Sequence, residues 1–217
     1  MPMSQNSISA PEGYTYGGAL FGDFDSLPTW RWLVIGNLWA LAPLAAAVGL
    51  LWLPYQLYVA FGAPLKLFAD PQLPTLALWI IGAVVVVASM GVHEGIHGLV
   101  LWLRGCPPRF SVASGYLFAT IREGQYLTRT DYLLMVLAPI VSMTLGGGVL
   151  LVLLPVSLGQ IVLVALLLNA AASVGDLAVA GRVRSKPAGT LFADINGIQY
   201  FVFASSREKE IDLLKNL

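Results

Sequence analysis

The residues best suited to chemistry are His93-Glu94-Gly95-Ile96-His97, which contain the chain's only two histidines. On a helix, side chains four residues apart share one face with their Cβ atoms about 5 to 6 Å apart, so both imidazoles can reach one zinc ion at roughly 2.0 to 2.1 Å. Glu94 stands beside them and can take a proton from a zinc-bound water. The pattern predicts a hydrolytic site with two histidine ligands and Glu94 as the general base.

A catalytic zinc ion needs a third protein ligand and one open position for water. Asp176 is the only other carboxylate inside an expected membrane span. It precedes Arg182 by six residues, and His97 precedes Arg104 by seven, so both lie roughly 9 to 11 Å in from the ends of their helices. We expect Asp176 to be the third ligand. The alternative is a carboxylate paired with a helix end or with Asn169.

Two polar residues come shortly before this aspartate. Asn169 and Ser173 lie seven and three residues before Asp176, on or near its helix face. Either side chain could hydrogen-bond a substrate backbone or hold a metal ligand in orientation. Asn and Ser inside membrane spans also form plain interhelical hydrogen bonds, so both interpretations stay open.

The composition of the chain around these residues is that of a protein that lies in lipid. Of its 217 residues, 57% are hydrophobic and 11% charged, with a mean hydropathy of +0.76, against roughly 45 to 50% apolar and about 25% charged residues in soluble domains. The net charge is zero and the basic residues are scattered, which argues against nucleic acid as a partner. A single cysteine, Cys106, excludes an internal disulfide and a thiolate metal cluster. Histidines and carboxylates must therefore hold any metal.

Four apolar runs can cross roughly 30 Å of hydrocarbon at 1.5 Å per residue. They cover about residues 32–53, 75–104, 132–154 and 158–181. The polar start of the chain lacks the basic segment of a signal peptide, so we expect the first run to be retained. The predicted fold is an all-α polytopic membrane protein, a four-helix transmembrane bundle with small β-hairpin elements. Its expected parts are a polar N-terminal segment (1–30), a transmembrane metalloprotease-like domain (31–186) and a C-terminal part (187–217).

The distribution of basic residues predicts the orientation of the chain. Four spans place both termini and the loop 104–131 on one side of the membrane, with Lys66 alone on the other. Since cytoplasmic loops are rich in Lys and Arg, both termini should be cytoplasmic and the protein a multi-pass protein of the cell membrane. The basic residues on the shared side are Arg31, Arg104, Arg109, Arg122, Arg129, Arg182, Arg184, Lys186, Arg207, Lys209 and Lys215.

Two segments outside the spans have β-strand character. Residues 108–127 mix aromatic or branched residues with polar ones and predict a hairpin at the membrane surface. Its edge strand could receive an unwound substrate by strand addition. Residues 190–203 contain two β-rich stretches joined by Asn196-Gly197, a strong hairpin signal. Residues 207–217 predict a short charged amphipathic helix.

Three segments carry a resemblance to a known family. HEGIHGLV, YLLMVLAPIV and NAAASVGDL, in this order, resemble the putative zincin peptidases, small bacterial membrane proteins related to the site-2 class of intramembrane metalloproteases. The resemblance covers about residues 75–203. It implies a zinc cofactor, His93, His97 and Asp176 as its ligands and Glu94 as the general base. Asn169 matches an asparagine that precedes the aspartate in site-2 proteases.

Together these observations predict a zinc-dependent intramembrane metallopeptidase that hydrolyses peptide bonds of membrane-associated proteins through a zinc-activated water. One alternative is a catalytically inactive metal-binding membrane scaffold or chaperone. Another is a small metal transporter, although transporters usually carry repeated halves, and this chain has no internal repeat. The expected partners are a membrane protein or peptide substrate and the lipid bilayer.

Overall fold

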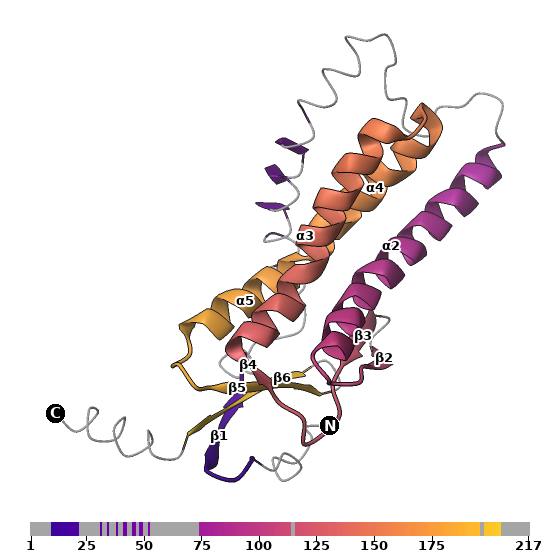
Figure 1. The fold of residues 1–217 in the computed structure, drawn as a ribbon. Helices are drawn as coiled ribbons and strands as arrows, with labels where there is room; N and C mark the ends of the chain where they lie inside the picture. Colours follow the sequence, from indigo (N-terminus) through magenta and orange to yellow (C-terminus); the bar gives the residue numbers. More distant parts are fainter. Residues whose placement is uncertain are drawn as a thin grey trace. The chain divides into compact units, whose positions relative to one another are not determined.

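The structure, a computed structural model, describes residues 10–21, 74–113, 116–195 and 198–204, and isolated residues between 31 and 52. The described residues form both helices and strands (Figure 1). In chain order they are β1 (Tyr14–Ala19), α2 (Thr75–Leu103), β2 (Arg109–Ala113), β3 (Tyr116–Thr120), β4 (Leu127–Thr128), α3 (Arg129–Leu153), α4 (Val156–Ala172), α5 (Val174–Ser185), β5 (Leu191–Ile195) and β6 (Ile198–Ala204).

Three stretches of helix in the described residues are long and apolar enough to cross a membrane. They are Thr75–Leu103, Arg129–Leu153 and Leu158–Ser185, so the last three expected spans are confirmed as apolar helices of spanning length. The first expected span, 32–53, lies mostly outside the described residues. The four-helix bundle therefore remains a prediction.

The surfaces of these helices suit lipid contact. Trp79 on α2 is 75% exposed, Val87 on α2 is 72% exposed and Val152 on α3 is 80% exposed. Apolar surface left in water costs about 25 cal/mol per Å², and soluble monomers rarely keep large apolar patches. In a bilayer the same side chains meet hydrocarbon and this cost disappears.

The last span differs from the single helix that was expected. Helix α4 ends at Ala172, Ser173 is its C-cap with φ −68° and ψ −2°, and α5 begins at Val174. Ser173 and the nearby Gly175 both have lower helix propensity than the alanines before them, which makes this a weak point in the helix. The break places Asp176 in the first turn of a helix instead of in a helix interior.

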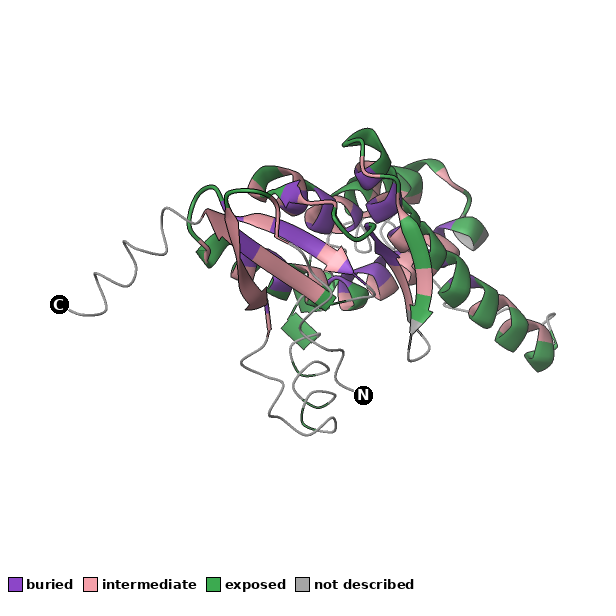
Figure 2. Cartoon of the chain, turned by 90° about the horizontal axis from the view of Figure 1, so that it is seen from below, coloured by how far each residue is buried: buried purple, intermediate pink, exposed green. Residues whose placement is uncertain are grey.

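The Cα positions divide the chain into two compact units. One contains Met1–Leu27, Ile96–Val136 and Ala178–Leu217, and the other Pro28–Gly95 and Leu137–Leu177. The first unit holds the strands. Its antiparallel sheet has the order β1-β6-β5-β4, and several of its residues are buried (Figure 2).

The hairpin expected around Asn196-Gly197 is confirmed, because β5 and β6 pair up to Ile195 and Ile198, on either side of those two residues. The outer strand β1 was not expected. It comes from the N-terminal segment that composition marked only as polar, and it pairs with β6 from Tyr14 opposite Ala204 to Ala19 opposite Tyr200. The predicted C-terminal helix, 207–217, lies outside the described residues.

The sheet also holds the start of α3. The Tyr132 ring packs on Phe192 of β5 with their centroids 5.4 Å apart, and both side chains are fully buried. Thr128 Oγ1 accepts a hydrogen bond from the Asp131 backbone N–H at 3.2 Å and donates to Asp131 Oδ2 at 2.7 Å. This arrangement caps the first turn of α3. Asp131 also pairs with Arg104, just after α2, at 3.2 Å.

The expected surface hairpin at 108–127 is present as β2 and β3, which pair from Arg109 opposite Thr120 to Ala113 opposite Tyr116. The Ile121 N–H donates to the Asp194 carbonyl at 3.0 Å, so the hairpin is tied to the larger sheet.

In the second unit, α3 and α4 meet closely at Gly147, where an added Cβ would lie 2.5 Å from Leu166 Cδ2. Gly147 therefore has the packing role expected of a small residue in a membrane span.

Candidate metal centre

The two histidines lie on α2 and are both buried, each with 5% of its surface exposed. Ligand atoms of His93, Glu94 and His97 all lie within 4.8 Å of one another. This spacing follows from helix geometry, because His97 lies four residues after His93 and three residues after Glu94, and both separations bring side chains together on one helix. Among the described residues, this is the group of His, Cys, Asp or Glu side chains that could hold a metal ion.

Each histidine is held by its Nδ1 atom. His93 Nδ1 donates to Asn169 Oδ1 at 2.9 Å, and His97 Nδ1 donates to the Met135 carbonyl at 2.8 Å. Both acceptors place the ring proton on Nδ1, which leaves the Nε2 lone pair of each imidazole for a metal. Metal-binding histidines in proteins are usually oriented in this way.

The predicted third ligand lies against the first. Asp176 Oδ2 is 3.1 Å from His93 Nε2, and 17% of its side-chain surface is exposed. With the Nδ1 proton directed to Asn169, His93 Nε2 and the carboxylate oxygen are two acceptors facing each other. A proton or a metal cation between them removes the repulsion. Two ligand atoms of a tetrahedral zinc ion lie about 3.3 Å apart, so this pair has the spacing of two zinc ligands.

Local helix structure supports the charge of Asp176. The residue lies in the first turn of α5, where unpaired backbone N–H groups give a helix a partial positive charge. The carboxylate is favoured at this position even before a cation arrives. This support depends on the break after α4, because a continuous helix would have no N-terminus there.

The donor set matches what zinc takes in proteins, namely imidazole nitrogens and carboxylate oxygens. His93 and His97 offer two nitrogens, and Asp176 reaches the cluster at His93. Glu94 follows His93 directly on α2 and is half-buried. The residues present therefore fit a zinc ion with Glu94 beside it.

The two neighbouring polar residues differ in what they contact. Asn169 is 2% exposed and holds His93, whereas Ser173 is fully buried. Within the described part of the chain, Asn169 Nδ2 and Ser173 Oγ have no hydrogen-bond partner. For Asn169 the contact matches the orienting alternative. Neither of the roles considered for Ser173 gains support from its contacts.

Sequence reasoning missed the group that holds His97. The Met135 backbone carbonyl carries no side-chain signal, but Pro139 lies four residues later inside α3. Proline lacks the N–H that would bond this carbonyl in a regular helix. A proline inside an apolar run was thus the available clue.

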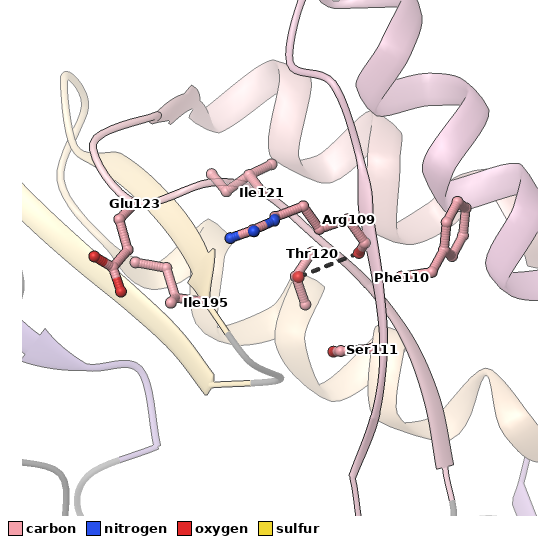
Figure 3. Close-up of a pocket in the computed structure, with 7 residues that line it drawn as sticks. All are labelled: Arg109, Phe110, Ser111, Thr120, Ile121, Glu123 and Ile195. Carbon is pink, nitrogen blue, oxygen red and sulfur yellow. Dashed lines mark hydrogen bonds between the residues drawn. The ribbon is translucent and has the colours of Figure 1, made fainter.

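The surface hairpin approaches α2 directly after the metal-binding pattern. A Cβ added to Gly98 would lie 2.6 Å from Phe110 Cζ, so the Phe110 ring of β2 rests where only a glycine leaves room. The hairpin also borders a hollow of about 340 Å³ (Figure 3). None of the candidate metal ligands lines it; its residues are Arg109, Phe110, Ser111, Thr120, Ile121, Glu123 and Ile195.

Comparison with known proteins agrees with the site. A family model described as putative zincin peptidase matches residues 75–191, which is more than half of the chain and includes the histidines, Glu94, Asn169 and Asp176. No curated protein and no solved structure matches the chain. With an HExxH helix whose buried histidines are both held through Nδ1, the chain belongs to the putative zincin peptidase family.

Proposed function

We propose that the chain is a zinc-dependent intramembrane metallopeptidase that hydrolyses peptide bonds of membrane-associated proteins. The observation that carries this proposal is the 3.1 Å approach of Asp176 Oδ2 to His93 Nε2 while His93 Nδ1 is bonded to Asn169. Two acceptors in a buried helical environment are costly without a proton or a metal cation between them. His93, His97 and Asp176 are the three ligands in this proposal.

A bound zinc ion acts as a Lewis acid and lowers the pKa of its water to about 7. Glu94 supplies the proton transfer. It lies next to His93 on α2 and is half-buried, so it can accept a proton from the attacking water and later pass one to the leaving amine. Asn169 keeps the His93 ring in place through its Oδ1.

The hairpin β2–β3 is suited to present the substrate. Peptide cleavage requires an extended backbone, and an unwound membrane segment needs new partners for its amide groups. Strand β2 pairs with β3 on one side in a two-stranded sheet. An extended substrate can add to its other edge by main-chain hydrogen bonds, with side chains entering the hollow beside Arg109 and Glu123. The Phe110 contact on Gly98 keeps this edge next to the metal-binding turn.

The proposal is tested with Glu94→Gln, which removes the base while keeping a side chain of similar size. Wild-type and variant chains are expressed in cells that lack the endogenous copy, and new protein termini in the membrane fraction are mapped by mass spectrometry. We expect termini within membrane-spanning segments of other proteins in the wild-type cells and their loss with Glu94→Gln. Bound zinc, measured on the purified chains, should stay near one ion per chain in both.

The control variant is Glu12→Gln, an exposed carboxylate in the N-terminal segment. It should behave as the wild type in both measurements. If wild-type cells show no such termini although the chain binds zinc, the metal-binding scaffold or chaperone becomes the better account. Zinc flux into proteoliposomes that contain the Glu94→Gln chain would instead favour the transporter.

A further inference from the structure

We propose that Pro139 is a positioning residue of the metal centre, because it frees the Met135 carbonyl to hold His97. This inference rests on the proposed zinc site. It assigns a role to a residue that contacts neither the metal nor the substrate. The observations that carry it are the position of Pro139 inside α3 and the 2.8 Å hydrogen bond from His97 Nδ1 to the Met135 carbonyl.

The first step concerns the backbone of α3. In an α-helix each carbonyl accepts a hydrogen bond from the N–H four residues later, so the partner of the Met135 carbonyl should be residue 139. That residue is a proline and has no N–H. Its ring also crowds the carbonyl four residues earlier and turns it away from the helix axis. The Met135 carbonyl is therefore available to a donor outside the helix.

The second step concerns burial. Met135 is 3% exposed and Pro139 is fully buried, so water has little access to this carbonyl. Buried backbone carbonyls are nearly always hydrogen-bonded. His97, itself 5% exposed, provides the donor. The carbonyl and the imidazole thus satisfy each other in a place where neither has solvent.

The third step links this bond to metal binding. With the proton on Nδ1 and the ring held at one angle, Nε2 is the one nitrogen of His97 with a lone pair for a metal. Ligand atoms of His93, Glu94 and His97 lie within 4.8 Å of one another. A residue with an N–H at position 139 would return the Met135 carbonyl to the helix and realign it with the axis. His97 would then lose its acceptor, and its ring would be free to rotate.

The inference predicts that Pro139→Ala changes helix stability and zinc affinity in opposite directions. Alanine at position 139 suits a helix far better than proline, so Pro139→Ala should leave the thermal midpoint of unfolding unchanged or raise it. Removal of a group that orients a metal ligand typically weakens metal binding about 10- to 100-fold. A residue whose role is only structural would not lower metal affinity while the fold becomes more stable.

The experiment uses the purified full-length chain in detergent. Zinc affinity is measured by competition with a chromophoric chelator, and cobalt(II) is substituted to record the absorption spectrum of the metal site. The thermal midpoint is measured by circular dichroism without metal. Pro155→Ala is the matched control, since Pro155 is the N-cap of α4 and lies outside the interior of any described helix.

A second variant separates the missing N–H from the proline ring. Position 139 is replaced with the α-hydroxy acid analogue of alanine by nonsense suppression, which gives an ester without an N–H and without a ring. We expect Pro139→Ala to bind zinc about 10- to 100-fold more weakly and to change the cobalt spectrum. The ester and Pro155→Ala should match the wild type.

Wild-type affinity in Pro139→Ala would overturn the inference while leaving the proposed zinc site intact. Weak binding by the ester would also overturn it, because the ring and not the missing N–H would then be responsible. If Pro139→Ala does not fold, the ester still tests the inference, because weaker zinc binding by the ester overturns it. Failure of the wild-type chain to bind zinc at all would remove the proposed function and this inference with it.

Discussion

At the scale of single residues, Asn169 is the side chain on which the orientation of His93 depends. Its Oδ1 accepts the His93 Nδ1 proton at 2.9 Å, and the residue is 2% exposed, so no water can take its place. We predict that Asn169→Ala weakens zinc binding about 10- to 100-fold. Asn169→Asp keeps an acceptor oxygen and should lose less. Competition with a chromophoric chelator measures both.

Gln160→Ala provides the control for this prediction. Gln160 carries the same amide group on the same helix α4, nine residues before Asn169. Its loss should leave zinc affinity unchanged. Equal affinities for Asn169→Ala and the wild type would show that the His93 ring needs no such support.

The residues of the site differ in how far the sequence could reveal them. His93, Glu94 and His97 share one helix, so spacing alone predicts that their side chains meet. The approach of Asp176 to His93 required an argument about depth in the membrane, and the 3.1 Å separation agrees with it. The Met135 carbonyl could not be found in this way, because backbone groups look alike in every sequence. Only the tertiary packing of α3 against His97 identifies it.

At the scale of elements, the outer edge of β2 should receive the substrate. Ala113 and Tyr116 are paired on either side of the two residues that join β2 and β3, so they form a hydrogen-bonded pair. Along the antiparallel ladder, hydrogen-bonded and non-hydrogen-bonded pairs then alternate. The backbone groups of Val112 then point away from β3. Val112→Pro removes an outward N–H without removing a ladder bond. The loss of one such hydrogen bond, about 1 kcal/mol, should slow substrate cleavage about fivefold to tenfold.

The rate at which the substrate's new termini accumulate measures this effect. Val112→Ala tests the side chain, which is 72% exposed, and should cleave at a rate near that of the wild type. Ser111→Pro lies at a ladder position and should disrupt the hairpin itself. Cleavage by Val112→Pro at the wild-type rate would exclude strand addition at this edge. Zinc affinity should stay the same in Val112→Pro and Val112→Ala.

Among the elements, those with local signals could be predicted and those made by distant pairing could not. The hairpin of β5 and β6 follows from Asn196-Gly197 between two β-rich stretches. Strand β1 has no such signal, since it is separated from β6 by about 180 residues and contains Gly17 and Gly18. Gly17 is needed there because an added Cβ would meet the Phe201 ring. This requirement arises only once the two strands are paired.

At the scale of the whole molecule, the amino-acid composition alone indicates that the chain lies in lipid and not in water. In the part of the chain that the structure describes, three apolar helices of spanning length and their exposed Val, Leu and Trp side chains agree with a membrane protein. The orientation rests on the positions of Lys and Arg alone and stays a prediction, as does the first span at 32–53. Helix packing cannot determine orientation, because the two sides of a membrane differ in charge bias and not in hydrophobicity.

The single cysteine allows the orientation to be tested. Cys106 lies just after α2 and is partly exposed. Burial, and secondarily the Asp131 carboxylate, raises the pKa of its thiol, so the reactive thiolate is scarcer at neutral pH than for an ordinary cysteine. Alkylation should therefore speed up as the pH rises toward 9. We predict that a membrane-impermeant maleimide labels Cys106 only after the cells are opened, because four spans place this loop in the cytoplasm.

Two introduced cysteines, each in a Cys106→Ser background, extend this test to the number of spans. Lys66→Cys reports on the side opposite Cys106 and should be labelled in intact cells, since the apolar helix α2 lies between the two positions. Ser4→Cys reports on the N-terminus. With a first span at 32–53 it shares the side of Cys106 and reacts only after opening, whereas a chain without that span would expose Ser4→Cys together with Lys66→Cys. Labelling of Cys106 in intact cells would contradict the predicted orientation, because the arginine-rich loop 104–131 would then lie outside the cytoplasm.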